Sequence, residues 1–258
     1  MKEKLLSTLK STLILCLMAG VIGLAANHSD KQQAALIYRQ ARQMAQVGET
    51  SQAAMISSPE EVPPPTIDLA ALQAKNSDVI GWISIPGTAV SYPLLQTQNN
   101  SFYLGHAWDK SSNSAGSIFL ECQCPADFSS FNAIVYGHRM EDGSMFGSLQ
   151  NYSSAEYWQQ HPSICVTLEE GTLQYDVFAA FEASVTDIVY GLDITDAALK
   201  QNFLEFCLAS SAIDTGIQPT ARDRVLTLST CTQSGGDTRW VVVGVLRGIN
   251  HGEEGILA

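Results

Sequence analysis

From residue 76 onward, short runs of β-branched and aliphatic residues alternate with turn-forming residues. These runs cover residues 79–85, 117–120, 131–136, 164–168, 173–181, 225–230 and 239–246. Repeated short strands separated by turn signals are typical of an all-β barrel or sandwich. The segment 196–210 differs, because its apolar residues recur at helical spacing behind Asp196 or Thr195 as a cap. The pattern predicts a mostly β domain with this peripheral helix and a second one over 153–160.

The N-terminal residues carry a different pattern. Residues 5–26 are uncharged apart from Lys10, and two lysines precede them. About 20 apolar residues are enough for a helix to cross a bilayer, and preceding lysines favour an N-terminus on the inner side. We therefore expect residues 1–4 in the cytoplasm and 5–26 as a transmembrane signal anchor. Cleavage after residues 23–26 is the alternative, and it would release the exported domain.

A stalk is expected between the membrane and the main domain. Residues 31–47 are rich in helix-forming residues, whereas 48–66 hold Gly, Ser, Thr and four prolines. We expect residues 27–65 to form an extracellular helix and a Pro-rich linker. The catalytic domain would cover 66–250, starting with a short helix capped by Thr66 or Asp68, and 251–258 would be a tail.

Charge and cysteine content narrow the class of function. The formal net charge of −12 repels phosphate backbones, so nucleic acid is not expected as a partner. Cys122, Cys124, Cys165 and Cys207 are too thinly spread for a disulfide framework. Cys122 and Cys124 have no further Cys or His at zinc-finger spacing, so we expect two residues on one face of a strand. We expect neither a metal nor another cofactor, and no role is assigned to these four cysteines.

Three residues that could carry chemistry lie at the ends of predicted strands. Cys231 ends one strand and precedes the small, polar loop 232–238. Arg239 opens the following strand, and hairpin geometry would bring it near Cys231. His138 follows another strand after a glycine. Alone, each has an ordinary explanation: a buried cysteine, a solvated histidine, or an arginine paired with Asp237. Together they suit a thiolate nucleophile, its acid–base partner and an oxyanion donor.

The sequence around these residues resembles the motifs of the sortase family of cysteine transpeptidases. Thr227–Cys231 followed by Arg239 resembles the T-L-x-T-C signature with an arginine on the next strand, and Tyr136–His138 resembles the histidine motif. Residues 81–88 resemble the first strand of the family, and segments 100–104, 114–119 and 143–152 are similar to class B sortases. The resemblance covers roughly residues 66–248. It implies a closed β-barrel of about eight strands with peripheral helices, preceded by a membrane helix and a short stalk.

The resemblance also implies a mechanism. Cys231 would attack the threonine carbonyl of an LPxTG-like or NPQTN-like sorting motif in secreted surface proteins. His138 would act as acid and base, and Arg239 would orient the substrate and stabilise the oxyanion. The thioester would pass to an amine of a peptidoglycan precursor or cross-bridge, outside the membrane of a Gram-positive-type cell. Substrate contacts are implied for Asn100, Leu104, Thr186, Tyr190 and Ser229.

Two other functions fit the same residues. A cysteine hydrolase would use water as the acceptor, and a surface binding module would keep the barrel without catalysis. The chain shows no lid motif of pilin-polymerising class C sortases, which disfavours pilin assembly. The loop between Cys231 and Arg239 is short for class B, so its local shape is not predicted.

Overall fold

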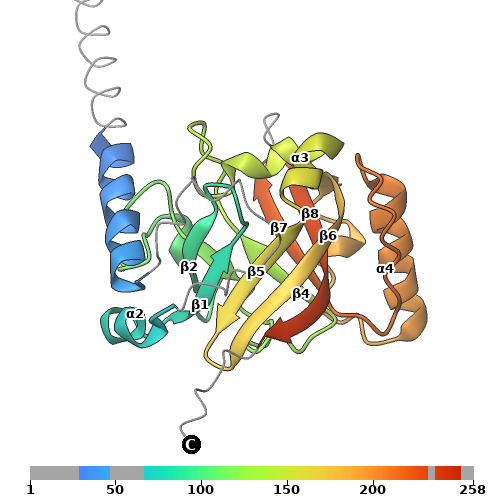
Figure 1. The fold of residues 1–258 in the computed structure, drawn as a ribbon, viewed down its shortest axis with the longest axis horizontal. Helices are drawn as coiled ribbons and strands as arrows, with labels where there is room; N and C mark the ends of the chain where they lie inside the picture. The colour runs from blue at the N-terminus through green and yellow to red at the C-terminus, as the bar shows by residue number, and fades with distance from the viewer. Residues whose placement is uncertain (1–28, 47–66, 232–235, 251–258) are drawn as a thin grey trace, which may run out of the picture.

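The computed structural model describes residues 29–46, 67–231 and 236–250 (Figure 1). The predicted membrane segment 5–26, the whole Pro-rich segment 48–66 and the tail 251–258 lie outside these residues. Within the described ranges, no helix combines the length and apolar character needed to cross a membrane.

Eight strands close into a barrel in the order β1-β2-β3-β4-β7-β8-β6-β5 (Figure 1). The strands are β1 Val79–Ser84, β2 Ser91–Leu95, β3 Ile118–Leu120, β4 Asn132–Tyr136, β5 Ser163–Leu168, β6 Gly171–Ser184, β7 Val225–Cys231 and β8 Thr238–Asn250. The pairs β2–β3 and β4–β7 are parallel, and the other neighbours are antiparallel. The predicted mostly β, closed eight-stranded barrel is confirmed.

The barrel interior is filled by side chains that alternate along the strands. In β5, Ile164, Val166 and Leu168 are buried while their neighbours are partly exposed. Ile83 of β1, which pairs with Val166, and Tyr175 of β6, which pairs with Ile164, are among the largest fully buried side chains. Because burial of each such side chain contributes on the order of 1.5–3 kcal/mol, this core holds the strand ends in fixed positions.

Short helices cover the outside of the barrel. They are α2 Leu69–Lys75, η1 Phe102–Leu104, η2 Gly147–Ser153, α3 Ala155–Gln160, η3 Ile188–Tyr190 and α4 Ala197–Ser210. The Asp68 side chain caps α2, and Asp196 caps α4 by accepting hydrogen bonds from the amides of Ala198 and Leu199. Phe203 and Cys207 of α4 are buried in a cluster that includes apolar residues of β6. Both predicted helices are present, and α3 is shorter than expected.

A further helix, over residues 29–44, lies along the barrel beside β1 and β2 (Figure 1). It confirms a helix within the predicted segment 31–47. Its buried residues, Ala34, Ile37, Tyr38 and Ala41, follow the i, i+3, i+4, i+7 spacing of one apolar helix face. The helix is therefore packed into the same core as the strands.

The expectation that Cys122 and Cys124 share a strand face is wrong. Strand β3 ends at Leu120, and the two cysteines lie in the turn that follows, where the Cys124 amide donates to the Glu121 carbonyl at 3.0 Å. The amides after Glu121 bond to side chains instead of a neighbouring strand: that of Cys122 donates to Oδ1 of Asn100 at 2.8 Å and that of Gln123 to Oε1 of Glu121 at 3.4 Å. Among the described residues, no group of three or more His, Cys, Asp or Glu side chains could hold a metal ion.

Candidate active site

The strand register brings the positions of His138, Cys231 and Arg239 to one end of the barrel. Parallel strands β4 and β7 pair Tyr136 with Ser229, and the Gly137 amide donates to the Ser229 carbonyl at 3.2 Å. His138 and Cys231 each lie two residues beyond that pair. Across the antiparallel β7–β8 pair, Cys231 lies opposite Arg239. Three neighbouring strand ends therefore carry the three residues.

The chain leaves β4 through Gly137 because no larger residue fits there. A Cβ atom at this position would lie 2.4 Å from Cδ1 of Ile118 and 2.6 Å from Cδ2 of Phe146, far inside van der Waals contact. The main chain beyond it is also held, since the Phe146 amide donates to the His138 carbonyl at 2.9 Å. The backbone of His138 is thus fixed from both sides.

The imidazole of His138 is oriented by a backbone group. Its Nε2 lies 2.7 Å from the carbonyl oxygen of Leu104 at the end of η1. A carbonyl oxygen can only accept, so Nε2 carries the proton and Nδ1 is the nitrogen left to exchange one. Gly116 packs against the ring, because a Cβ there would lie 2.7 Å from Cδ2 of His138.

Arg239 is partly exposed at the start of β8. Its Nη1 donates to the carbonyls of Gly236 and Thr238 at 2.7 and 2.8 Å. No ion pair between Arg239 and Asp237 is found among the described residues. These bonds hold one Nη of the guanidinium against the turn. The group has five N–H donors in all, so it keeps capacity for a carbonyl or an oxyanion.

Two residues predicted to contact substrate bind each other. The Tyr190 hydroxyl of η3 lies 2.8 Å from Oγ of Ser229, two residues before Cys231 on β7. Asn132 fixes this arrangement, because its Nδ2 donates to the Val189 carbonyl at 3.0 Å. The side chain of Ser229 is buried, so Tyr190 is the member of the pair nearer the surface.

Asn100, also predicted to contact substrate, is held by a buried carboxylate. Its Nδ2 donates to Oε2 of Glu121 at 2.5 Å, and its Oδ1 accepts from the Cys122 amide at 2.8 Å. Glu121 is only 4% exposed, and the same Oε2 accepts from the Tyr136 hydroxyl at 3.0 Å. Burial acts to raise the pKa of Glu121, but hydrogen bonds from Asn100, Cys122 and Tyr136 outweigh it and hold the pKa below its usual value.

Sequence reasoning missed Glu121, the residue that holds Asn100 in place. A single glutamate after a three-residue strand carries no motif, and its partners come from three separate segments. The signal that could have found it is an acidic residue next to a strand whose other residues are all buried.

The last two predicted substrate residues lie on opposite sides of these strand ends. The Leu104 side chain is 47% exposed, whereas its carbonyl oxygen binds His138. Thr186 is exposed in the turn after β6, and the preceding Val185 amide donates to the Asp237 carbonyl at 2.9 Å. Thr186 therefore lies near the start of β8, the strand that begins beside Arg239.

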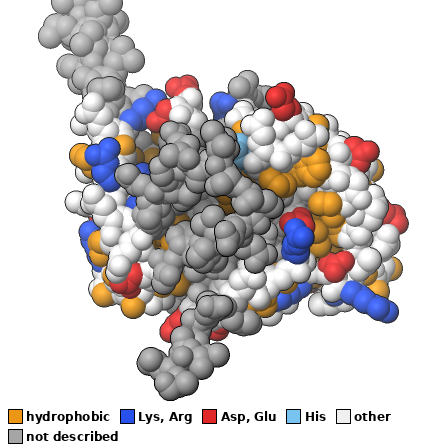
Figure 2. All heavy atoms as spheres, viewed as in Figure 1, with side chains coloured by type: hydrophobic (Ala, Val, Ile, Leu, Met, Phe, Trp, Pro, Cys, Tyr) orange, Lys and Arg blue, Asp and Glu red, His pale blue; other side chains and the backbone are white. Residues whose placement is uncertain are grey.

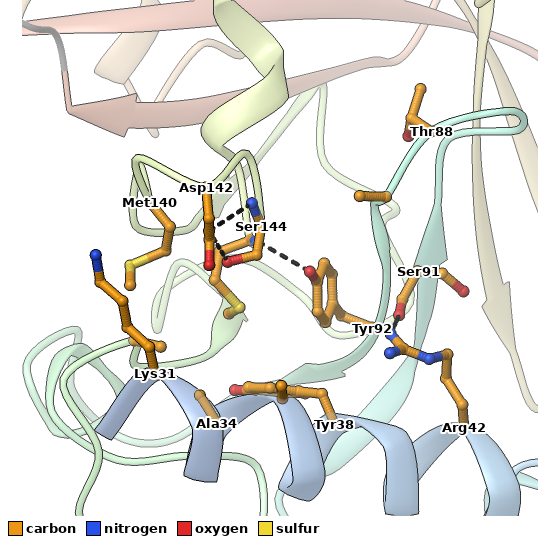
Figure 3. Close-up of a pocket in the computed structure, with 14 residues that line it drawn as sticks. Lys31, Ala34, Tyr38, Arg42, Thr88, Ser91, Tyr92, Met140, Asp142 and Ser144 are labelled. Carbon is orange, nitrogen blue, oxygen red and sulfur yellow. Dashed lines mark hydrogen bonds between the residues drawn. The ribbon is translucent and has the colours of Figure 1, made fainter. Parts of the chain in front are cut away.

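A cavity of about 380 Å³ lies between the helix of residues 29–44, the β1–β2 turn and the loop after β4 (Figure 3). Its lining includes Tyr38, Arg42, Tyr92, Asp142 and Ser144, and the rings of the two tyrosines meet edge to face (Figure 3). None of the predicted site residues lines it.

On the face of the molecule shown in Figure 2, acidic and basic side chains are interspersed among the described residues.

A closed β-barrel with Cys, His and Arg at three neighbouring strand ends defines a candidate thiol acyl-transfer enzyme. A sortase domain model matches residues 83–247, and the chain belongs to the sortase family. Sortase B of Listeria monocytogenes is 34% identical over 64% of this chain and 67% of its own length. Sortase B of Staphylococcus aureus is 30% identical over 69% of this chain and 72% of its own length.

Solved structures agree with this assignment. A Staphylococcus aureus sortase B–substrate complex superposes with a TM-score of 0.73 and 29% identity, covering 86% of this chain and all of that one (100%). A crystal structure of Staphylococcus aureus sortase B gives a TM-score of 0.67 and 30% identity, over 70% of this chain and 87% of that one. The chain is a class B sortase, and its activity is that of a cysteine transpeptidase.

Proposed function

We propose that Cys231 is the nucleophile, His138 the acid–base and Arg239 the oxyanion donor of this transpeptidase. The observation that carries this assignment is the register, with Tyr136 opposite Ser229 and Cys231 opposite Arg239. This register supports a site in which a thiolate, an imidazole and a guanidinium surround one reacting carbonyl.

The reaction has two acyl transfers. In the first, the Cys231 thiolate attacks the carbonyl carbon of a substrate threonine, and Arg239 stabilises the oxyanion. The C–N bond breaks, and His138 gives its Nδ1 proton to the leaving amine. In the second, an incoming amine attacks the thioester and gives a proton to His138. The C–S bond breaks, a new amide forms and the Cys231 thiolate is regenerated.

The substrate is proposed to be a secreted surface protein with an LPxTG-like or NPQTN-like sorting motif. Its motif would bind over Asn100, Leu104, Thr186, Tyr190 and Ser229. The exposed Leu104 side chain and the Tyr190 hydroxyl, both beside the strand ends, support this path. The acceptor would be an amine of a peptidoglycan precursor or cross-bridge.

The proposed location is the outer side of a Gram-positive-type cell membrane. Residues 1–4 would be cytoplasmic, 5–26 the anchor, 27–65 the stalk and 66–250 the catalytic domain, followed by the tail 251–258. The apolar, uncharged run after the N-terminal lysines supports the anchor. With this order, the helix of residues 29–44 would follow the membrane directly.

The test is a transfer assay with the full chain purified in detergent. Fluorogenic LPxTG-like and NPQTN-like peptides are incubated with triglycine or a diaminopimelate-bearing amine, and products are read by mass spectrometry. An amide product that requires Cys231 is expected, and the cleaved peptide identifies the motif. A product that never contains the amine would instead indicate a hydrolase. Absence of cleavage together with a Cys231 unreactive toward thiol reagents would overturn the assignment.

A further inference from the structure

The helix of residues 29–44 is hydrogen-bonded to segment 105–117, which contacts the His138 ring. Trp108 Nε1 donates to the Ile37 carbonyl at 3.2 Å, and Asn113 Nδ2 donates to the Asp30 carbonyl at 3.3 Å. The Ser114 amide donates to the Asp30 carboxylate at 3.1 Å. The helix is thus bound at several points to the segment 105–117, which follows η1.

Tyr38 makes the innermost of these contacts. It is 4% exposed, and its hydroxyl donates to the Gly116 carbonyl and lies 3.1 Å from Oγ of Ser117. Its ring meets Tyr92 edge to face, with centroids 5.2 Å apart, which restricts the side chain to this direction (Figure 3). A buried phenol in this setting fixes the position of the Gly116 carbonyl.

Gly116 links the position of its own carbonyl to that of His138. It has φ +58°, a conformation that favours glycine, and a Cβ there would lie 2.6 Å from the Tyr103 carbonyl oxygen and 2.9 Å from that of Leu104. The same Cβ would lie 2.7 Å from Cδ2 of His138. Gly116 therefore touches both the imidazole and the carbonyl that orients it, so a shift of Gly116 moves the pair.

We propose that the N-terminal helix positions His138 for proton transfer, with Tyr38 as the positioning residue that acts through Gly116 and the Leu104 carbonyl. The inference rests on the proposed role of His138. It gives the helix after the predicted membrane anchor a function beyond a spacer: it holds the acid–base in its reactive orientation.

The test compares Tyr38→Phe with Tyr152→Phe in the full chain. Tyr152 is a matched control, because its fully buried hydroxyl also donates to a carbonyl, that of His161 at 2.6 Å, away from His138. Tyr152→Phe loses this one phenol hydrogen bond, and Tyr38→Phe loses those to Gly116 and Ser117. We expect Tyr38→Phe to lower kcat about tenfold with KM little changed, since catalytic groups tolerate little displacement. Tyr152→Phe should keep the wild-type kcat per folded molecule.

A second readout does not depend on turnover. In protein labelled with ¹⁵N-histidine, the Nε2–H signal of His138, assigned with His138→Gln, should be resolved in wild type and Tyr152→Phe and be broadened or shifted in Tyr38→Phe. If Tyr38→Phe does not fold, Ser114→Ala, which removes the hydrogen bond from the Ser114 hydroxyl to the Asp30 carboxylate, should show the same change in smaller measure. Unchanged signals and kcat in the folded Tyr38 or Ser114 variant would overturn the inference. A wild type that transfers nothing would count against the proposed function, while the histidine signals would still decide the coupling.

Discussion

The imidazole Nε2 of His138 donates to the main-chain carbonyl of Leu104 across 2.7 Å. A backbone carbonyl here occupies the place that a carboxylate takes in a Ser-His-Asp triad, where it sets the tautomer and the direction of the ring. A neutral carbonyl stabilises an imidazolium less than a carboxylate does. It ties the ring instead to the path of η1 and the segment after it.

Substitution of the nucleophile should remove transfer and leave the fold. Cys231→Ala is expected to give no amide product while circular dichroism and the thermal midpoint stay close to wild type, because a single strand-end side chain is removed. Cys165→Ala provides the control, as its residue lies on β5 and is not part of the proposed site. Transfer by Cys231→Ala at the wild-type rate would show that another group is the nucleophile.

Thiol reactivity should separate Cys231 from three other cysteines. Burial raises the pKa of the Cys124, Cys165 and Cys207 thiols, so these three carry little thiolate at neutral pH. We expect an alkylating reagent at pH 7 to modify Cys231 well before these three in the folded protein. Peptide mapping by mass spectrometry after timed quenching measures the order, and faster labelling of Cys165 or Cys207 would contradict it.

Arg239 should matter more for turnover than for binding. Arg239→Ala is expected to lower kcat by about 10²–10³, the usual cost of losing one oxyanion donor, and Arg239→Lys should recover only part of it. Lysine restores the charge but not the planar set of donors. Steady-state kinetics with the cleaved sorting peptide give both constants. A loss confined to KM would make Arg239 a binding residue only.

Glu121 should make the free energy of unfolding depend on pH in the acid range. Its pKa is held below the ordinary value of 4.5. A depressed pKa stabilises the folded protein above pH 4.5, and that contribution is lost as the pH falls through the folded-state pKa. Glu121→Gln should cost about 1–3 kcal/mol at pH 7, because Asn100 and Tyr136 lose a charged acceptor. Urea unfolding from pH 7 downward should show the gap to wild type narrowing below pH 4.5; a gap independent of pH would contradict this.

Much of this fold could be predicted, because most strands and the capped helix α4 are indicated by local sequence patterns. The pattern does not predict strand β2, because Pro93 lacks an amide donor and proline is uncommon in strand interiors. In the structure Pro93 lies within β2 and pairs with Trp82 of β1. The residues proposed for catalysis also come from local motifs, and the strand register brings their backbone positions to one end of the barrel. The contact of Tyr38 with Gly116 could not be predicted, because it joins residues 78 positions apart that share no pattern.

The loop that carries His138 offers the sharpest test of how tightly the site is built. Gly137→Ala would place a Cβ 2.4 Å from Ile118 and 2.6 Å from Phe146, so the strand end must move. We expect a loss of about 1–3 kcal/mol in unfolding free energy, as for other overpacked cores, together with a kcat at least tenfold lower because His138 is displaced. Both are measured on the same sample, by urea unfolding and by the transfer assay.

Gly143→Ala separates displacement of His138 from general strain in the same loop. Gly143 has φ +79°, so alanine is strained there by about 1–2 kcal/mol, but its Cβ would meet nothing within 4 Å. The two variants should therefore lose similar stability while only Gly137→Ala loses turnover. Equal kcat values in the two variants, at equal folded fractions, would mean that the β4 end does not set the position of His138, and that the Leu104 carbonyl and Gly116 hold the ring without it.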